Sequence, residues 1–301
     1  MGECRKLVSL VKRNTKCYFK DKVSFFMSLI TPLILLILFV TFLRNVYIES
    51  FTSAFPEGFT VDTKLTEGIA GAWLMSSILS VSSVTVAFCS NLVLVDDKIN
   101  GNINDFNVSP VKPTTISLSY FVSNFFVTFT VLMVAMCIGH IYLGIMGWEI
   151  SAGNFFMIIV DCVCGILFGT LLAGIVESFI STQGGLSAVA TLVSSMYGFL
   201  CGAYMPISSF SKGLQSVLGL LPGTYSVGIL RNHYMAGYLD ALSYAGLPEE
   251  GLNAIRDGFD VNLYVFGNKI PLGAMYGILL GACAVLISVY VTIVILKNKK
   301  K

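Results

Sequence analysis

The feature that most limits how this chain can fold is a series of apolar runs, each about as long as a lipid bilayer is thick. The first, residues 23–43, carries no charge and is bounded by Lys22 and Arg44. A helix needs about 20 apolar residues to cross the roughly 30 Å hydrocarbon core. Charged residues make up 12% of the chain, against roughly 25% in soluble domains. These observations predict an all-α membrane protein with no large soluble domain.

The apolar runs predict six membrane-spanning helices within one domain over residues 1–301. We place the spans at about 23–43, 69–95, 116–144, 154–176, 186–203 and 272–296. Lys and Arg concentrate at both ends of the chain, with seven of the 19 in the first 22 residues and a terminal KNKKK. Basic flanks favour the cytoplasmic side. We therefore expect a multi-pass plasma-membrane protein with both termini in the cytoplasm, which requires an even number of spans.

Residues 1–22 are predicted to form an amphipathic helix on the inner membrane surface. At 100° per residue the apolar arc contains Cys4, Leu7, Val8, Val11, Thr15, Tyr18 and Phe19. The opposite arc contains Arg5, Lys6, Lys12, Arg13, Lys16 and Lys20. This pattern is typical of a helix whose apolar face dips into the lipid headgroups. A signal peptide with a long basic start is the alternative, although no convincing small-residue cleavage site follows.

Two segments have the composition of outer regions. Residues 44–68 contain Glu49, Glu57, Asp62 and Glu67, which predicts an outer loop. In residues 205–270, Pro206 and Pro222 bracket an apolar piece too short to cross the bilayer, and a second short piece follows. Apolar pieces of this length favour re-entrant or interfacial helices. Acids outnumber bases over residues 236–269, which predicts a small exposed lobe.

The second span is rich in serine, with Ser76, Ser77, Ser80, Ser82 and Ser83. Small residues let membrane helices approach closely, so this face is predicted to pack against another helix. The pair Gly165 and Gly169 in the fourth span suggests a similar close-packing face. A polar lining for a substrate path is the alternative for the serines.

Three ionisable side chains lie within or at the ends of predicted spans. His140 and Asp161 each lie about ten residues from the turn near Glu149, so a hairpin would bring them to similar depth. A carboxylate can keep an imidazole protonated at low dielectric, which makes their pairing a hypothesis. Asp161 would be either a substrate or proton contact, or an internal polar link. Glu177, at the inner end of its span, is expected to reach water.

No motif for catalysis or nucleotide binding is present in the sequence. It lacks GxxxxGK[ST], HExxH, GxSxG and any Cys/His spacing typical of a metal site. We therefore predict that the chain is not itself an enzyme, and that it binds no cofactor, metal or nucleic acid.

Residues 96–114, DDKINGNINDFNVSPVKPT, form a short polar segment between the second and third spans. Asp97, Gly101 and Ser109-Pro110-Val111 resemble the loop motif of the permease subunit of type-2 ATP-binding-cassette exporters. Segments 202–210 and 221–235, with Pro206, Pro222, Tyr225 and Arg231, are similar to the motifs that enter and leave that family's outer re-entrant helices. The resemblance covers nearly the whole chain. Asp97 stands where glutamate is usual, and Asn102 replaces a common threonine.

The resemblance implies that residues 96–114 are a coupling helix held by a separate cytoplasmic ATPase, which would bind the ATP and Mg. Lys98, Asp105 and Lys112 would then complement the charge of the partner. Phe106, Val108 and Val111 would supply an apolar anchor. An ordinary solvated loop is the alternative.

The resemblance also implies a second permease subunit, identical or a sibling, surrounded by membrane lipid. The expected cargo is an amphipathic drug, a peptide antibiotic or a lipid-linked compound moved outward. The alternative from another class is a stand-alone proton-coupled secondary transporter that uses Asp161 and His140 as a relay.

Overall fold

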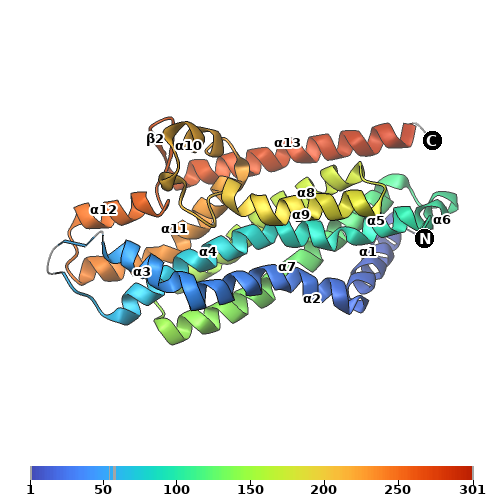
Figure 1. The fold of residues 1–301 in the computed structure, drawn as a ribbon. Helices are drawn as coiled ribbons and strands as arrows, with labels where there is room; N and C mark the ends of the chain where they lie inside the picture. Colours follow the sequence, from blue (N-terminus) through green and yellow to red (C-terminus); the bar gives the residue numbers. More distant parts are fainter. Residues whose placement is uncertain (1, 54, 57–58, 300–301) are drawn as a thin grey trace.

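The computed structural model describes residues 2–53, 55–56 and 59–299, which form an elongated bundle of helices (Figure 1). Glu57 of the predicted outer loop and Lys300 and Lys301 of the basic C-terminus lie outside the described residues. The elements in chain order are α1 (Glu3–Lys20), α2 (Lys22–Leu38), the π-helix η1 (Phe39–Leu43), α3 (Arg44–Thr52), α4 (Thr63–Ser90), α5 (Leu92–Ile99), α6 (Asn102–Val108), α7 (Pro113–Met146), α8 (Ala152–Ser178), α9 (Gln183–Leu200), the 3-10 helix η2 (Ile207–Ser209), α10 (Lys212–Leu218), α11 (Pro222–Tyr244), α12 (Glu249–Gly258), β1 (Leu263–Val265), β2 (Asn268–Ile270) and α13 (Leu272–Lys299).

Helices α1, α5 and α6 lie at one end of the bundle together with the C-terminal end of α13, and α3 and α12 lie towards the other (Figure 1). We call these the α6 end and the α12 end. Among the described residues, four helical segments are long and apolar enough to cross a membrane, namely Thr63–Ile99, α7, α8 and the part of α13 up to Leu296. Two bent pairs raise the number to six if each is one span: α2 and η1 with α3, bent by 63°, and α10 with α11, bent by 91°. The all-α membrane fold is confirmed.

Two of the predicted boundaries differ from the structure. Much of the predicted outer loop 44–68 is helical, because α3 continues the first span and α4 already begins at Thr63. Asp62 caps α4 by accepting a hydrogen bond from the Lys64 amide at 3.1 Å, which is a favourable N-cap. The predicted fifth span corresponds to α9, whose 18 residues extend only about 27 Å. Helix α9 is not among the candidate spans, and its crossing of the membrane stays a prediction.

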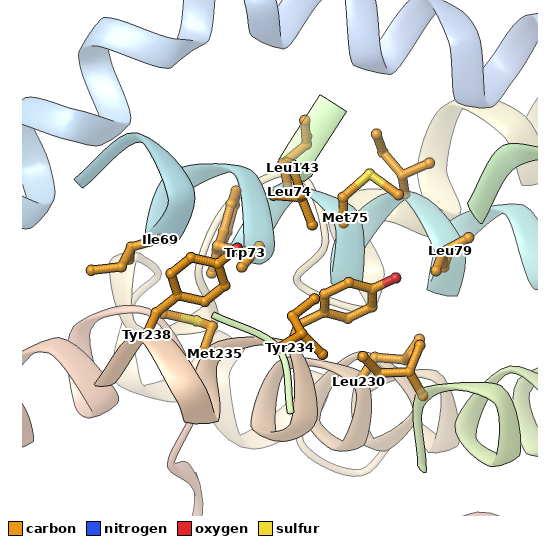
Figure 2. Close-up of a cluster of buried hydrophobic side chains, with 14 of the residues drawn as sticks. Ile69, Trp73, Leu74, Met75, Leu79, Leu143, Leu230, Tyr234, Met235 and Tyr238 are labelled. Carbon is orange, nitrogen blue, oxygen red and sulfur yellow. The ribbon is translucent and has the colours of Figure 1, made fainter. Parts of the chain in front are cut away.

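Helix α4 is the central element of the bundle, and every residue from Gly68 to Phe88 is buried. Figure 2 shows its side chains Trp73 and Met75 in one cluster with Tyr234 and Tyr238 of α11 and with Leu143 of α7. This cluster forms the main apolar core. The core lies along the α4–α11 contact.

The serine face of α4 packs against helices, as the sequence predicted. Ser80 donates a hydrogen bond to Ser226 of α11 at 3.2 Å. Gly169 of α8 lies so close to the Ser83 carbonyl group that a Cβ atom would not fit. Close approach of this kind is what small residues permit in membrane helices.

The predicted small exposed lobe over residues 236–269 is only partly exposed, because some of its side chains belong to the main core. Helix α11 is one continuous helix of 23 residues, and its Tyr238 and Leu242 are fully buried in the main core. Helix α12 adds Leu252 and Ile255 to the same core. Of the acidic residues that suggested a solvated lobe, Glu249 and Glu250 are exposed at the start of α12, whereas Asp260 is buried beyond its end. The acidic residues of α12 obscured the apolar residues that recur with helical spacing on its other face.

Strands β1 and β2 form a short antiparallel hairpin that leads into α13. Leu263 pairs with Ile270 and Val265 with Asn268. The two turn residues, Phe266 and Gly267, have φ values of 50° and 80°. Two successive positive φ values are typical of the type I′ turn that joins tight hairpins.

Candidate functional site

The polar segment 96–114 is a pair of short helices rather than an open loop. Helix α5 ends at Ile99, α6 covers Asn102–Val108, and α7 begins at Pro113. Gly101 lies between the two short helices with φ of 78°, a left-handed conformation that glycine adopts without steric cost. The segment therefore has a defined shape at the α6 end of the bundle.

Asp97 is the centre of a polar cluster that joins four elements. Its side chain is 4% exposed and accepts hydrogen bonds from Arg13 of α1 at 2.8 Å, Tyr120 of α7 at 2.6 Å and Asn102 of α6 at 2.9 Å. The guanidinium group of Arg13 also lies 5.3 Å from the centre of the Phe106 ring. We call Asp97, Arg13, Tyr120, Asn102 and Phe106 the Asp97 cluster. It fixes the short helices to α1 and α7.

The electrostatics of the Asp97 cluster favour the charged pair. The hydrogen bonds that Arg13 donates to Asp97 raise the pKa of the Arg13 guanidinium above its ordinary value, against an opposing effect of burial. The side chain of Arg13 is about one third exposed, whereas that of Asp97 is nearly covered. Charge-assisted bidentate contacts between guanidinium and carboxylate groups are stronger than neutral hydrogen bonds. The pair therefore remains ionised.

Helix α1 packs against α7 along its length. Asn14 donates to Ser119 at 3.3 Å, and the hydroxyl groups of Thr15 and Ser123 lie 3.0 Å apart. The placement of Arg13 on a water-facing arc was therefore wrong, because the pattern of charges did not reveal its partner in α5. Val8 and Phe19 of the predicted apolar arc are exposed. Their contact with lipid headgroups stays a prediction.

Lys98 ties the segment to a third region of the bundle. Its ammonium group donates to three carbonyl oxygens at the end of α8, those of Glu177 at 2.9 Å, Ser178 at 3.3 Å and Ile180 at 3.4 Å. A cation is favourable at a helix C-terminus, where carbonyl groups lack intrahelical partners. Gln183 of α9 also donates to Asp96 at 2.8 Å. Lys98 thus binds the end of α8 and is only partly exposed, and its contact with a partner stays a prediction.

The side chains that face outward from the segment form a separate surface. Val108 is 88% exposed, and Ile99 is also an exposed apolar residue. Asn104, Asp105 and Pro110 of the same segment are also exposed. We call these five residues the α6 surface. Ser109 and Val111 of the predicted motif are only partly exposed, and Ser109 donates to the Phe106 carbonyl at 2.6 Å.

Asp161 of α8 is fully buried, but its partners are not the predicted one. One carboxylate oxygen lies 2.7 Å from Nδ1 of His233 in α11, and the other accepts a hydrogen bond from Tyr276 of α13. Nδ1 of His140 lies instead 2.7 Å from the carbonyl oxygen of Met136. The predicted His140–Asp161 pair was therefore wrong. The hairpin argument considered only α7 and α8, whereas α11 supplies the imidazole.

Glu177 is also fully buried, so the expectation that it reaches water was wrong. Neither carboxylate oxygen has a hydrogen-bond partner among the described residues. The neighbouring Lys98 is engaged by backbone carbonyl groups. Burial of a charge without partners is very costly, which favours a neutral carboxyl group.

We expect Glu177→Gln to leave the free energy of unfolding unchanged or slightly higher, because a neutral amide replaces a carboxyl group that has no partner. Asp161→Asn is the matched comparison, since it changes a buried acid that has two partners. The Asp161→Asn variant should have a free energy of unfolding about 1–3 kcal/mol lower than that of the parent protein. Thermal unfolding of both variants in lipid nanodiscs measures the difference. A large loss of stability in Glu177→Gln alone would contradict this account.

Arg231 of the predicted outer motif is the centre of a second buried cluster. Its side chain is 1% exposed and donates to the Gly202 carbonyl at 2.6 Å, to Asp260 at 3.2 Å and to Ser77 at 3.2 Å. The guanidinium group lies 4.6 Å from the Trp73 ring centre. Arg231 thus connects α11, α4, the end of α9 and the end of α12.

Asp260 connects this cluster to the start of η2. It accepts hydrogen bonds from the amides of Ile207 and Ser208, the latter at 3.2 Å. Burial raises the pKa of Asp260, and the charge of Arg231 together with these amides opposes the shift.

The remaining motif residues shape the chain near the bend between α10 and α11. Pro206 immediately precedes η2, and Pro222 is the first residue of α11, a position that proline favours. Tyr225 donates to the Gly219 carbonyl at 2.6 Å. Pro206, Pro222 and Tyr225 therefore stabilise the bend, and none of the three adds an acidic or basic side chain.

Comparison with known protein families matches residues 5–235 to the ABC-2 type transporter family. No match was found among curated proteins. The matched range runs from α1 through the Asp97 cluster and Arg231 to the middle of α11. ABC-2 membrane domains work with ABC ATPase subunits. The chain belongs to the ABC-2 type transporter family and is a permease subunit of an ABC transporter.

Proposed function

We propose that this permease subunit belongs to an ATP-driven exporter and receives its motion from cytoplasmic ATPase subunits through the α6 surface. The observation that carries the proposal is the contrast between the two sides of segment 96–114. Val108 faces outward, whereas Asp97 and Lys98 bind α1, α7 and the end of α8. A partner that moves the outer side would therefore move several helices as a rigid body.

In this proposal the α6 end faces the cytoplasm of a cell whose plasma membrane holds the protein. Both basic ends of the chain support this orientation, because α1 and the C-terminal end of α13 lie at the α6 end (Figure 1). The α12 end would then lie outside. ATP and Mg would be bound by the partner, and this chain would contribute no catalytic group.

A second permease subunit, identical or a sibling, would complete the pathway. Helix α9 supports this part of the proposal, because Leu192, Met196 and Phe199 are exposed along one stripe with helical spacing. The cargo class we propose is an amphipathic drug, a peptide antibiotic or a lipid-linked compound. Its support is the resemblance of the loop and outer motifs to type-2 exporters.

We expect Val108→Asp to reduce recovery of the ATPase partner at least about tenfold in pull-downs from membranes, because a charge replaces the most exposed apolar side chain of the α6 surface. The matched control is Tyr244→Asp, which introduces the same charge at a 92% exposed side chain at the α12 end. It should leave recovery unchanged. Equal recovery in both variants, or labelling of residue 108 from outside the cell, would overturn the proposal.

Energy dependence distinguishes this function from a stand-alone proton-coupled transporter. Export by the proposed complex should stop when ATP is depleted and persist when the proton gradient is dissipated. The measurement is cargo efflux from cells or vesicles under the two treatments. Efflux that survives ATP depletion and collapses with the proton gradient would reject the ATP-driven mechanism.

A further inference from the structure

A buried carboxyl group and a buried amide group lie without hydrogen-bond partners at the interruption between α4 and α5. Both carboxylate oxygens of Glu177 and the side-chain nitrogen of Asn91 are buried and unpaired among the described residues. Glu177 is 0% exposed and Asn91 is 4% exposed. Asn91 is nevertheless close enough for its amide group to act on the Glu177 carboxyl group. Native proteins rarely leave such groups unsatisfied, and each exception needs a specific cause, such as a functional role or a bound water molecule.

Lys98 of α5 lies beside the same carboxyl group. Its charge acts on Glu177, but it donates no hydrogen bond to the carboxyl oxygens. The ammonium group donates instead to the backbone carbonyl oxygen of Glu177 at 2.9 Å and to that of Ser178 at 3.3 Å. The carbonyl group and the carboxyl group belong to one residue. A shift of α5 along the end of α8 can therefore exchange one partner of the ammonium group for the other.

The two positions of the ammonium group require opposite charge states of Glu177. A carboxylate that is buried without a partner is very costly, so the arrangement described here favours the neutral acid. An ammonium group that moves into contact favours the ionised form instead, and the Asn91 amide could then donate to the carboxylate as well. The thiol group of Cys89 in α4 is the other titratable group that faces this carboxyl group. It carries no positive charge and cannot replace Lys98.

We propose that the Glu177 carboxyl group is a second binding position for Lys98, occupied when the ATPase partner displaces segment 96–114. The segment would move with α1 and α7, to which Asp97 binds it, and relative to α8. Glu177 then releases its proton to the water at the α6 end, and its carboxylate accepts hydrogen bonds from Lys98 and Asn91. The proton rebinds when Lys98 returns to the carbonyl groups. This inference rests on the proposed function, because the ATPase supplies the displacement, and it makes Glu177 a positioning residue.

Infrared spectroscopy in lipid nanodiscs observes the carboxyl group directly. The permease alone should show the C=O stretching band of a neutral carboxyl group that Glu177→Gln removes and the matched variant Asp161→Asn retains. Trapping the complex with its ATPase in ATP and vanadate should reduce this band at least about fivefold in the parent protein. The band should stay unchanged in Lys98→Met. A band that is absent before trapping, or that persists after it in the parent protein, would overturn the proposal.

Export provides a second readout that a merely structural role would not change. Glu177→Gln should still bind the ATPase but should export at least about fivefold less cargo per ATP, because an amide cannot form an ion pair with Lys98. Glu177→Asp, which keeps a carboxyl group, should retain more export than Glu177→Gln. The matched control Glu250→Gln removes an exposed acid of α12 and should change nothing. Normal export by Glu177→Gln would show that the carboxyl group only binds water. Failure of the parent protein to recover any ATPase would instead reject the proposed function, and this inference with it.

Discussion

Asp97→Ala should uncouple ATP hydrolysis from transport while the membrane helices remain folded. The substitution leaves Arg13 without its carboxylate and the buried Tyr120 hydroxyl without an acceptor. Breaking a buried ion pair costs about 3–5 kcal/mol, and we expect the lower end, about 3 kcal/mol, because Arg13 is one third exposed. Residues 96–114 should therefore lose protection in amide hydrogen exchange. Export by the reconstituted complex should fall at least about tenfold, with ATP hydrolysis retained.

A double-mutant cycle shows whether the effect belongs to the pair. The cycle compares Arg13→Ala, Asp97→Ala and the variant that carries both substitutions. The double variant should lose little more stability than Asp97→Ala alone, because the two residues share one interaction. Lys12→Ala is the matched control, since Lys12 is exposed on the same helix. It should change neither exchange nor transport. Additive losses in the cycle would contradict the assigned pairing.

Arg231→Ala should destabilise the protein by about 3–5 kcal/mol, because it leaves Asp260 buried without its cation. That is a large share of the roughly 5–15 kcal/mol by which native proteins are stable. The Gly202 carbonyl group and the Trp73 ring also lose their contacts. The measurements are the yield of folded protein in detergent and the thermal unfolding midpoint.

Arg256→Ala is the comparison for this prediction. Arg256 pairs with Glu249 on the outer face of α12, where the Glu249 side chain is 70% exposed, and exposed pairs are worth about 0–1 kcal/mol. The double variant Arg231→Met with Asp260→Asn should recover part of the stability, because no buried charge remains and an amide oxygen at position 260 can still accept from the Ser208 amide. A single Arg231→Ala variant as stable as Arg256→Ala would show that the buried cluster contributes little.

The length of the apolar runs predicted the main helices well. Helices α8 and α13 closely match the predicted spans because a bilayer sets a physical length that the sequence must satisfy. The path through residues 205–270 could not be predicted in the same way. Acids outnumber bases over residues 236–269, yet Tyr238 and Leu242 form part of the main core. Only the spacing of apolar residues along α11, read as one helix, would have indicated burial.

The candidate site, like the fold, could be predicted from the sequence only in part. The sequence identified Asp97 and Val108 as parts of one segment, because a polar interruption between spans is visible without a structure. It could not indicate that Asp97 points inward, since the partners Arg13 and Tyr120 come from distant elements. His233 was missed for the same reason. The signal available was a histidine two residues after Arg231, but its use required knowing that α11 lies against α8.

The two buried clusters are joined by one element. Ser77, which binds Arg231, and Asp97 belong to the same helical segment, Thr63–Ile99, which is interrupted only at Asn91. Twenty residues separate them, or about 30 Å along a helix axis, which is the thickness of the hydrocarbon core. The segment can thus transmit motion over this distance, from the Asp97 cluster to the buried contacts of Arg231. The rigidity of the segment at Asn91, where the helix is interrupted, would determine how much of an ATP-driven displacement is transmitted from the Asp97 cluster to Arg231.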